Sequence, residues 1–398
     1  YKDIEIPSSF EEIISVFERE EKGSGEKLKT FMADASYNYK VAIEKIVNKP
    51  GLSPLELVTP ETVSKINQFF TSISSKIRKK FKSHKLIQIL EFPVLFLGAK
   101  PQDTPLFYNF MNYADFVLGT WYPKGGMVKI VEAMVELGKE LGVEYFTNAD
   151  VTKINTEKGF VKGITVGDEF ISSDIVLSGA DYAHTETLLE TNMKQYSDAY
   201  WDKKVFAPSS LLFYVGFDKK LANVRHHNLF FDKSFDKHAE EIYDLPQWPK
   251  DPLFYASFPS ITDNSVSPEG KECAFFLVPL APGLKYNQDL LESYFKVILK
   301  RLEEQTNQEL EKHVLFKIPF CVEDFKKDYN SYKGNAYGMA NTLKQTAFLR
   351  PGIKSKKVKN LFFTGQLTVP GPGVPPALIS GRIVSEQISK ETLKTPVS

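Results

Sequence analysis

The sequence has little of what identifies a secreted, nucleic-acid-binding or metal-binding protein. It holds only two cysteines, Cys273 and Cys321, which are too few for a disulfide framework and suit a reducing compartment. Its 50 basic residues match its 50 acidic ones, so no overall charge favours a nucleic acid as partner. The adjacent His226 and His227 have no Cys-x-x-Cys or His-Glu-x-x-His motif near them, and a surface loop explains them better than a metal site.

Long apolar runs are also lacking, because none reaches the ~18 residues that a membrane-spanning helix needs. Phenylalanine and tyrosine are plentiful instead, at 31 and 18 residues. This content fits a large apolar cavity and fits a phenylalanine-rich core equally well, so composition leaves both open. At 398 residues the chain is long enough to bury a sizeable core and to form two domains.

Familiar catalytic motifs are missing as well. Residues 23–25, Gly-Ser-Gly, look like part of a phosphate loop, but they follow a helical pattern and no third glycine comes at the required spacing. Glu323 and Asp324 are adjacent, so their side chains point apart and we expect them at the surface. There is no Ser-His-Asp order and no pair of carboxylates at helical spacing. The residues alone therefore name no nucleophile and no proton acceptor.

The stretch from Lys359 to Glu391 is the most informative part of the chain. A short apolar run, Leu361–Phe363, predicts a buried strand, and Gly371–Pro376 predicts a turn rich in glycine and proline. A helix rich in small residues is predicted over Ala377–Ile388. Glycines before a helix start let backbone amides approach a ligand, and the helix N-terminus favours negative charge. A strand, turn and helix packed only for stability is the alternative.

The rest of the chain divides into helical and strand-rich stretches. Helices are predicted over Thr59–Phe81, Leu86–Leu97, Met127–Leu141 and Leu290–Glu304. Strands are predicted over Val143–Phe146, Asp150–Asn155, Phe160–Val166, Ile175–Leu177, Leu211–Phe217, Leu253–Ser257 and Cys273–Leu280. Over Tyr1–Ile6 the side chains alternate in polarity, which predicts a strand that includes the first residue of the sequence.

These elements and their motifs resemble the phytoene desaturase family, the bacterial FAD-dependent carotenoid desaturases, over essentially the whole chain. The resemblance rests on the Gly371–Pro376 turn and the Tyr-Pro-x-Gly-Gly-Met segment at 122–127. It also rests on the Gly-Ala-Asp segment at 179–181, which follows the strand predicted over Ile175–Leu177, and on the segment at 329–338. It implies an α/β fold of the GR2 flavoprotein type, in which a Rossmann-like FAD-binding domain is joined to an α+β substrate domain of sheet and helices.

The same resemblance implies the domain boundaries. Residues 1–120 are expected to form the helical part of the substrate domain, and residues 191–350 its sheet part. Residues 121–190 and 351–398 are expected to belong to the FAD-binding domain. The family begins with a Gly-x-Gly-x-x-Gly unit that holds the FAD pyrophosphate, and no such motif occurs in this sequence. We therefore expect that the N-terminal dinucleotide-binding segment is missing from the chain.

The resemblance also implies which residues hold FAD. The Gly371–Val374 loop is expected to pass the ribityl chain and to start a helix at the pyrimidine end of the isoalloxazine, whereas the backbone of Val151 is expected to meet the adenine. Gln366 stands where related flavoproteins have an acidic or small residue. The full set of expected FAD contacts is Gly125, Gly126, Val151, Ala180, Asp181, Gly365, Gln366, Gly371, Gly373, Val374 and Pro375.

For function, the resemblance implies FAD-dependent desaturation of a carotenoid in carotenoid biosynthesis, with hydride passing from the substrate to the flavin. The Gly371–Pro376 loop and the His226–Asn228 stretch look most like the branch of 1-hydroxycarotenoid 3,4-desaturases. Alternatives are a flavin-dependent carotenoid isomerase or oxygenase, and a carotenoid-binding protein without catalysis. An amine oxidase is weaker, because nothing marks an aromatic cage for a cationic substrate.

A basic run predicts where the protein meets a membrane. Lys76–Lys85 carries six cations and no acid, and the apolar segment Leu86–Leu97 follows it directly. Such a pair of segments can lie on an anionic membrane surface. We therefore expect a cytoplasmic protein that is peripheral on the membrane. A solvated helix face beside a core helix is the alternative reading of the same residues.

Overall fold

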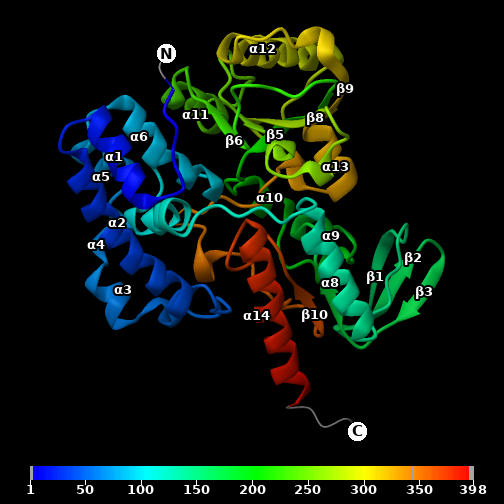
Figure 1. The fold of residues 1–398 in the computed structure, drawn as a ribbon. Coiled ribbons are helices and arrows are strands. Elements are labelled where there is room, and N and C mark those ends of the chain that lie inside the picture. The colour runs from blue at the N-terminus through cyan, green and yellow to red at the C-terminus, as the bar shows by residue number, and fades with distance from the viewer. Residues whose placement is uncertain (1–2, 343, 394–398) are drawn as a thin grey trace.

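A computed structural model describes residues 3–342 and 344–393, and its elements are shown in Figure 1. We call residues 10–118 the helical part; it lies at the left of the figure. Its α-helices are α1 (Phe10–Glu20), α2 (Ser24–Val41), α3 (Pro60–Ser64), α4 (Asn67–Phe70), α5 (Ile73–Lys80), α6 (His84–Glu91) and α7 (Phe110–Tyr113).

Hydroxyl caps divide the helical part more finely than its apolar pattern predicts. The single helix predicted over Thr59–Phe81 is wrong, because it is three helices. The Thr59 hydroxyl accepts the Thr62 N–H at 3.2 Å and starts α3, and the Ser72 hydroxyl accepts the Ser75 N–H at 3.2 Å and starts α5. The buried faces share one core, whose members include Ile13, Phe17, Leu28, Phe31, Ile77, Phe81, Leu86 and Leu90.

The middle of the chain forms a helix, a small antiparallel sheet and the first strand of a parallel pair. Its elements are α8 (Val128–Glu140), β1 (Val151–Glu157), β2 (Phe160–Val166), β3 (Glu169–Ser172), β4 (Val176–Ser178), α9 (Tyr182–Thr187) and α10 (Asp198–Asp202). The strands β1, β2 and β3 pair in that order.

Two predicted strands are absent from the described residues. Val143–Phe146 forms no strand in the described chain, and all four of its residues are exposed. In the predicted strand at Tyr1–Ile6, residues 1–2 lie outside the described part, and Asp3–Ile6 is not a strand. There Asp3 and Glu5 bond to Gln305 and Arg225 instead. A period-two pattern makes a strand only where a partner strand satisfies its backbone groups.

We call residues 205–334 the sheet part, which lies at the top of Figure 1. Its elements are β5 (Ser209–Phe217), β6 (His227–Phe230), α11 (Phe235–Tyr243), β7 (Phe254–Ser257), β8 (Glu272–Leu280), α12 (Gln288–Thr306), β9 (Val314–Phe320) and α13 (Val322–Tyr329). The strand order is β6-β7-β8-β5-β9. Phe213 of β5 pairs with Phe276 of β8, and its ring lies 5.2 Å from that of Phe295 in α12.

The last two elements return to the middle of the chain. Strand β10 (Leu361–Phe363) pairs in parallel with β4, and α14 (Val374–Thr392) runs from there toward the C-terminus (Figure 1). The Phe363 ring stacks on Tyr182 of α9 at 3.7 Å between ring centroids. The Val161 N–H donates to the Lys359 carbonyl at 3.2 Å, which ties the β1-β2-β3 sheet to the start of β10.

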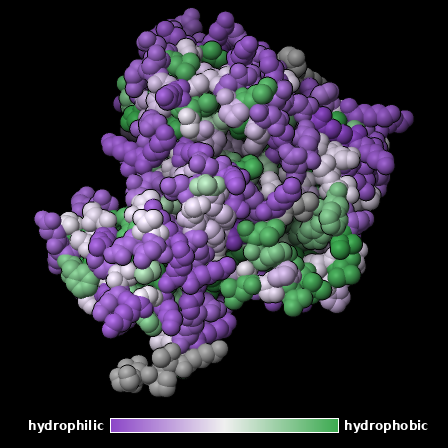
Figure 2. Space-filling model, turned by 180° about the vertical axis from the view of Figure 1, so that it is seen from behind, coloured by the Kyte–Doolittle hydropathy of each residue, from purple (hydrophilic) through white to green (hydrophobic). Residues whose placement is uncertain are grey.

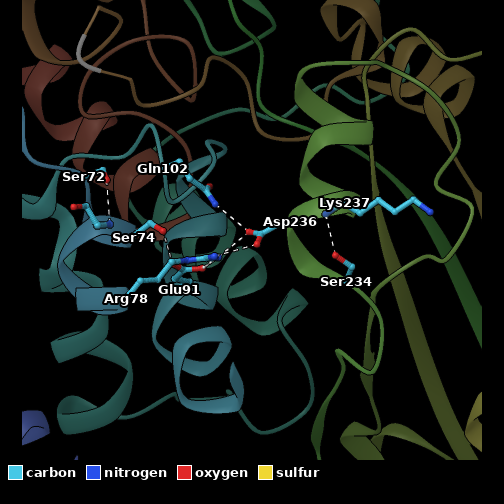
Figure 3. Close-up of polar contacts among 9 residues, drawn as sticks. Ser72, Ser74, Arg78, Glu91, Gln102, Ser234, Asp236 and Lys237 are labelled. Atoms are coloured by element: carbon cyan, nitrogen blue, oxygen red, sulfur yellow. Dashed lines mark hydrogen bonds and ion pairs between the residues drawn. The ribbon is translucent and has the colours of Figure 1, made fainter. Parts of the chain in front are cut away.

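The helical part and the sheet part are joined by a charged contact (Figure 3). Arg78 of α5 donates to both oxygens of Glu91 at 2.8 and 2.9 Å and reaches across to Asp236 of α11 at 2.7 and 3.0 Å. Glu91 is fully buried and also accepts the Ser74 hydroxyl. A buried carboxylate destabilises the fold unless it is paired. Arg78 of the basic run Lys76–Lys85 therefore stabilises the fold by pairing with Glu91.

Candidate functional site

The carboxyl ends of β4 and β10 meet at one edge of the parallel pair. Phe363 lies opposite Ser178, and the Thr364 N–H donates to the Ser178 carbonyl at 2.9 Å. A Cβ placed on Gly365 would lie 3.8 Å from the Gly179 carbonyl, so the turns after the two strands run side by side. Open α/β sheets bind ligands at the carboxyl ends of their parallel strands, and most of the predicted site residues follow these two strands.

The start of α14 provides two free backbone donors. Pro375 and Pro376 have no N–H, and the Ala377 N–H already donates to the Gly373 carbonyl at 2.9 Å. Within the described residues, the amides of Gly373 and Val374 make no hydrogen bond, and both residues are exposed. The free positive end of this 19-residue helix is therefore concentrated on two adjacent amides.

Glycine is required in the loop that leads into α14. Gly371 has φ +128° and Gly373 has φ +119°, a region that side chains rarely adopt. A Cβ on Gly371 would lie 3.1 Å from the Asn341 side-chain oxygen, and one on Gly373 would lie 3.2 Å from the Pro376 ring. The loop is thus packed closely from inside and leaves its outer backbone open to a ligand.

A buried serine connects α14 to the end of β10. The Ser380 hydroxyl accepts the Gly365 N–H at 3.0 Å and lies 3.0 Å from the hydroxyls of both Thr364 and Thr368. In the sequence, Ser380 is one of several small residues of the helix predicted over Ala377–Ile388. Its spacing from Gly365 carries no signal of this contact, because the two meet only when α14 folds back on β10.

Gln366 and Asp181 are used by the fold itself. The Gln366 carbonyl accepts from Arg350 at 2.9 Å, and its side chain packs against Gly338. The buried Asp181 carboxylate accepts the N–H groups of Ala183, His184 and Tyr332 at 2.9, 3.3 and 3.1 Å, and burial raises its pKa. Asp181 therefore caps α9 and holds a distant loop. Ala180 beside it is exposed at the end of the β4 turn.

Three predicted site residues lie in other elements. The Gly125 N–H donates to Asp263 of the sheet part, and the Gly126 N–H donates to Pro123 at 3.0 Å. Val151 opens β1 and pairs with Val166. In the part of the chain that the structure describes, no hydrogen bond joins these three to the Gly365–Val374 loop. Their FAD contacts remain predictions.

The two adjacent histidines are engaged separately. His226 Nδ1 lies 2.6 Å from the Thr262 hydroxyl, and His227 Nδ1 lies 2.6 Å from the Tyr255 hydroxyl. Across residues 3–342 and 344–393, no group of three or more His, Cys, Asp or Glu side chains is arranged to hold a metal ion.

The residues present fit a flavin. Two free amides suit the edge of a flavin that gains negative charge. A Cβ on Gly371 or Gly373 would crowd the neighbouring side chains, so only glycine leaves this backbone accessible. The free donors at this point are the backbone amides of Gly373 and Val374, so recognition there would come from the backbone.

Comparison with known proteins agrees with this geometry. The family model described as flavin containing amine oxidoreductase matches residues 55–389. The chain belongs to this family. Within the flavin containing amine oxidoreductases, a carotenoid 3,4-desaturase from Haloarcula japonica is 38% identical over 395 residues, which are 98% of this chain and 79% of that protein. A zeta-carotene-forming phytoene desaturase from Myxococcus xanthus is 28% identical over 383 residues, covering 93% of this chain and 72% of that protein.

These relatives confirm the resemblance to the phytoene desaturase family, and with it an FAD-dependent oxidoreductase. An oxidoreductase from Methanosarcina mazei shares the fold with a TM-score of 0.56 at 18% identity, over 84% of this chain and 74% of that one. The predicted α/β flavoprotein fold is therefore confirmed as well. Of the residues that shape the site, Arg350, Asn341 and Ser380 were missed by sequence reasoning.

Proposed function

We propose that this protein catalyses the FAD-dependent desaturation of a carotenoid polyene. The observation that carries the proposal is the pair of free amides at Gly373 and Val374, held where β4 and β10 end. It occurs in a chain that is 38% identical to a carotenoid 3,4-desaturase over 98% of its length. Bound FAD supplies the hydride acceptor, so the tasks of the protein are to bind, align and exclude water.

Each of these tasks can be given to residues of this chain. The amides of Gly373 and Val374 would offer fixed donors to a flavin that gains negative charge, without reorganisation during the reaction. The Ser380 contact with Gly365 holds that helix start against β10. We assign the expected contacts of Gly125, Gly126 and Val151 to the same cofactor, supported by their resemblance to the family motifs.

A finer proposal concerns the substrate. The relative from Haloarcula japonica is a carotenoid 3,4-desaturase, which supports a reaction of the 1-hydroxycarotenoid 3,4-desaturase type. We expect a hydroxylated carotenoid to bleach the FAD-loaded protein without oxygen and to yield a product with one more double bond. A bleached flavin and no such product would contradict desaturation. Products of unchanged oxidation level would indicate an isomerase, and no bleaching would indicate carotenoid binding alone.

We also propose that the protein binds to a membrane surface through residues 52–70 of the helical part. In this segment polar side chains are buried and apolar side chains are exposed. Thr62 and Gln68 are buried, whereas Val63, Ile66 and Phe70 between and after them are exposed. Gln68 is drawn inward because it bonds to Asn38 at 2.6 Å and to Asp34 at 3.0 and 3.2 Å. The exposed apolar side chains of this surface are Leu52, Leu55, Val58, Val63, Ile66 and Phe70.

This apolar surface supports lipid contact better than the basic run does. Figure 2 shows apolar side chains gathered at the lower right, on the side where the helical part lies. In the run Lys76–Lys85, Arg78 is committed to Glu91 and Asp236 (Figure 3). None of the described helices is both long and apolar enough to cross a membrane. A lipid-soluble substrate fits an enzyme that lies on the bilayer.

Flotation with vesicles of phosphatidylcholine and phosphatidylglycerol separates the two surfaces. Leu55→Ser with Phe70→Ser should release the protein at every salt concentration, because it removes apolar area from the lipid contact. Lys79→Glu with Lys82→Glu should weaken binding only at low salt, by about 1 kcal/mol per cation lost. Flotation that survives the serine variant and fails in the glutamate variant would contradict the apolar surface. If the unaltered protein is a dimer and the serine variant is a monomer, a second copy of the chain, and not lipid, covers the apolar surface.

A further inference from the structure

A buried arginine lies directly behind the glycine loop. Arg350 follows a short 3-10 helix, Ala347–Leu349, that precedes β10, and only 4% of its surface is exposed. A Cβ placed on Gly371 would lie 3.3 Å from its Nη2 atom, so the guanidinium touches the loop from inside. It donates to five oxygens at 2.9 to 3.1 Å, namely the carbonyls of Met339, Gln345, Gln366 and Thr368 and the side-chain amide of Asn341.

All five of these oxygens are uncharged. In residues 3–342 and 344–393, no carboxylate lies within ion-pair distance of Arg350. The groups that interact electrostatically with it are the hydroxyls of Tyr108 and Tyr200 and the Lys204 ammonium, which is itself a cation. Burial lowers the pKa of Arg350 to about 10, which still leaves it protonated at neutral pH. A buried charge without a counter-charge is costly. The contrast is Arg301 of α12, which is also largely buried but pairs with Asp232.

The donors of Arg350 are all taken by the protein, so the residue has no hydrogen left to offer a ligand. Arg350 can therefore act on a ligand only through its positive charge and through the backbone conformation that its hydrogen bonds impose. It joins the Gln366 and Thr368 carbonyls, which precede the glycine loop, to the Met339 carbonyl of a distant segment. The free amides of Gly373 and Val374 come two and three residues after the glycine that it touches.

We infer that Arg350 is a positioning residue of the flavin site, whose uncompensated charge makes the Gly371–Val374 loop favour negative charge on the bound flavin. The inference rests on the proposed function, because it needs the flavin in this loop. A fixed positive charge in a dry site lowers the free energy of any anionic state beside it. Bound FAD would supply such a charge on accepting a hydride, and the role of Arg350 would be to stabilise it.

Asn341→Asp tests the charge with almost no change of shape. The new carboxylate would stand 3.0 Å from Nη1 of Arg350, where the amide oxygen now accepts, and would neutralise the guanidinium. Sulfite is the probe, because its lone pair adds to N5 of oxidised flavin and pushes an electron pair onto the pyrimidine edge. The bleaching of full-length, FAD-loaded protein gives the dissociation constant, and a redox titration gives the midpoint potential.

We expect Asn341→Asp to bind sulfite on the order of tenfold more weakly and to lower the potential, as one lost unit charge requires. Arg350→Lys keeps the charge and loses the fork of donors, so it should keep sulfite affinity while its melting temperature falls. Arg301→Gln, a buried arginine of the sheet part, is the control that should leave sulfite affinity unchanged. If Asn341→Asp does not fold, Arg350→Gln loaded with excess FAD replaces it.

Unchanged sulfite affinity and potential in the neutralised variant would overturn the inference. Arg350 would then only hold the loops together. If that result comes with normal carotenoid desaturation, the proposed function stands. If instead the unaltered protein bleaches with sulfite and desaturates no carotenoid, the proposed function fails and the role of Arg350 is unaffected.

Discussion

The sheet part and the pair of β4 with β10 are held together in different ways. Eight of the nine positions of β5 are buried, and phenylalanine rings from β7 and β8 pack around it. The strands of the parallel pair are only three residues long, and the turn after β10 is fixed by polar groups of Ser380 and Arg350. Apolar packing is non-directional, whereas hydrogen bonds fix angles and distances. The first region therefore supplies stability, and the second supplies geometry.

Phe276→Ala should give the largest loss of stability, because this residue lies at the centre of the sheet part. Its ring is fully buried and meets Phe254 and Phe258 edge to face, at 6.4 and 6.1 Å between centroids. Truncation should cost about 3–5 kcal/mol, measured by denaturant unfolding. Leu315→Ala, at an exposed position of β9, is the control and should stay within ~0.5 kcal/mol. FAD reduction in the folded fraction should be normal, and a slowed rate would break the division between the two regions.

Acid should weaken the sheet part through His238. Burial lowers the pKa of this residue to about 4, although the Pro279 carbonyl, 3.1 Å from Nε2, opposes the shift. The neutral ring accepts the Leu253 N–H at 2.8 Å. The unfolded value is about 6.5, so the unfolded state binds the proton first. Stability should therefore fall as the pH drops from ~6.5 to ~4, by up to about 3 kcal/mol.

His238→Gln checks the assignment, because an amide can make both hydrogen bonds and does not titrate in this range. Thermal melts of this variant should lose most of their slope between those two pH values. An equal slope in the variant and the parent protein would assign the acid sensitivity to other groups.

Gly373→Ala should have a smaller effect on stability and a large effect on chemistry. At φ +119° a Cβ costs about 1–2 kcal/mol, and the Cβ would press on the Pro376 ring. We expect the rate of flavin reduction per FAD-loaded molecule to fall on the order of tenfold to a hundredfold, because the amide donors move away from the flavin. Anaerobic stopped-flow beside a thermal melt measures both.

Gly381→Ala, in the same helix, is the matched control with the smallest effect. A Cβ there meets nothing within 4 Å, so the helix should gain about 1 kcal/mol and flavin reduction should stay normal. A normal reduction rate in Gly373→Ala as well would mean that the loop only shapes a turn.

Two helices show which features of the fold the sequence predicts and which it does not. The apolar residues of α12 and α8 recur at helical spacing, and both helices were predicted close to their observed bounds. In α12 the apolar face is buried under the sheet, at Leu291, Phe295, Ile298 and Leu302. In α8 the equivalent face is exposed, at Val128, Val131, Met134 and Leu137. A periodic pattern predicts that a helix forms, and it does not say which element covers it.

The site shows the same limit. The Gly371–Pro376 loop was predicted because local rules govern it: positive φ needs glycine, and proline suits the first helical turn. Arg350 and Asn341 were missed because an arginine before a proline in a loop is ordinary. Their importance depends on what surrounds them after folding. The sequence predicts membrane contact at Lys76–Lys85, because a run of charge is visible in sequence. The inward-facing Gln68, on which the proposed apolar surface depends, is not.

The sequence by itself determined the helical periodicity of α8 and α12 and the glycine-rich start of α14. Each of these depends on residues within a few positions of one another, where sterics and hydrogen bonds act without the rest of the fold. Only the tertiary structure decided that Ser380 meets Gly365, that Arg350 touches Gly371 and that Arg78 pairs with Asp236. These contacts join residues brought together by packing, and their energies depend on burial, which no local pattern records.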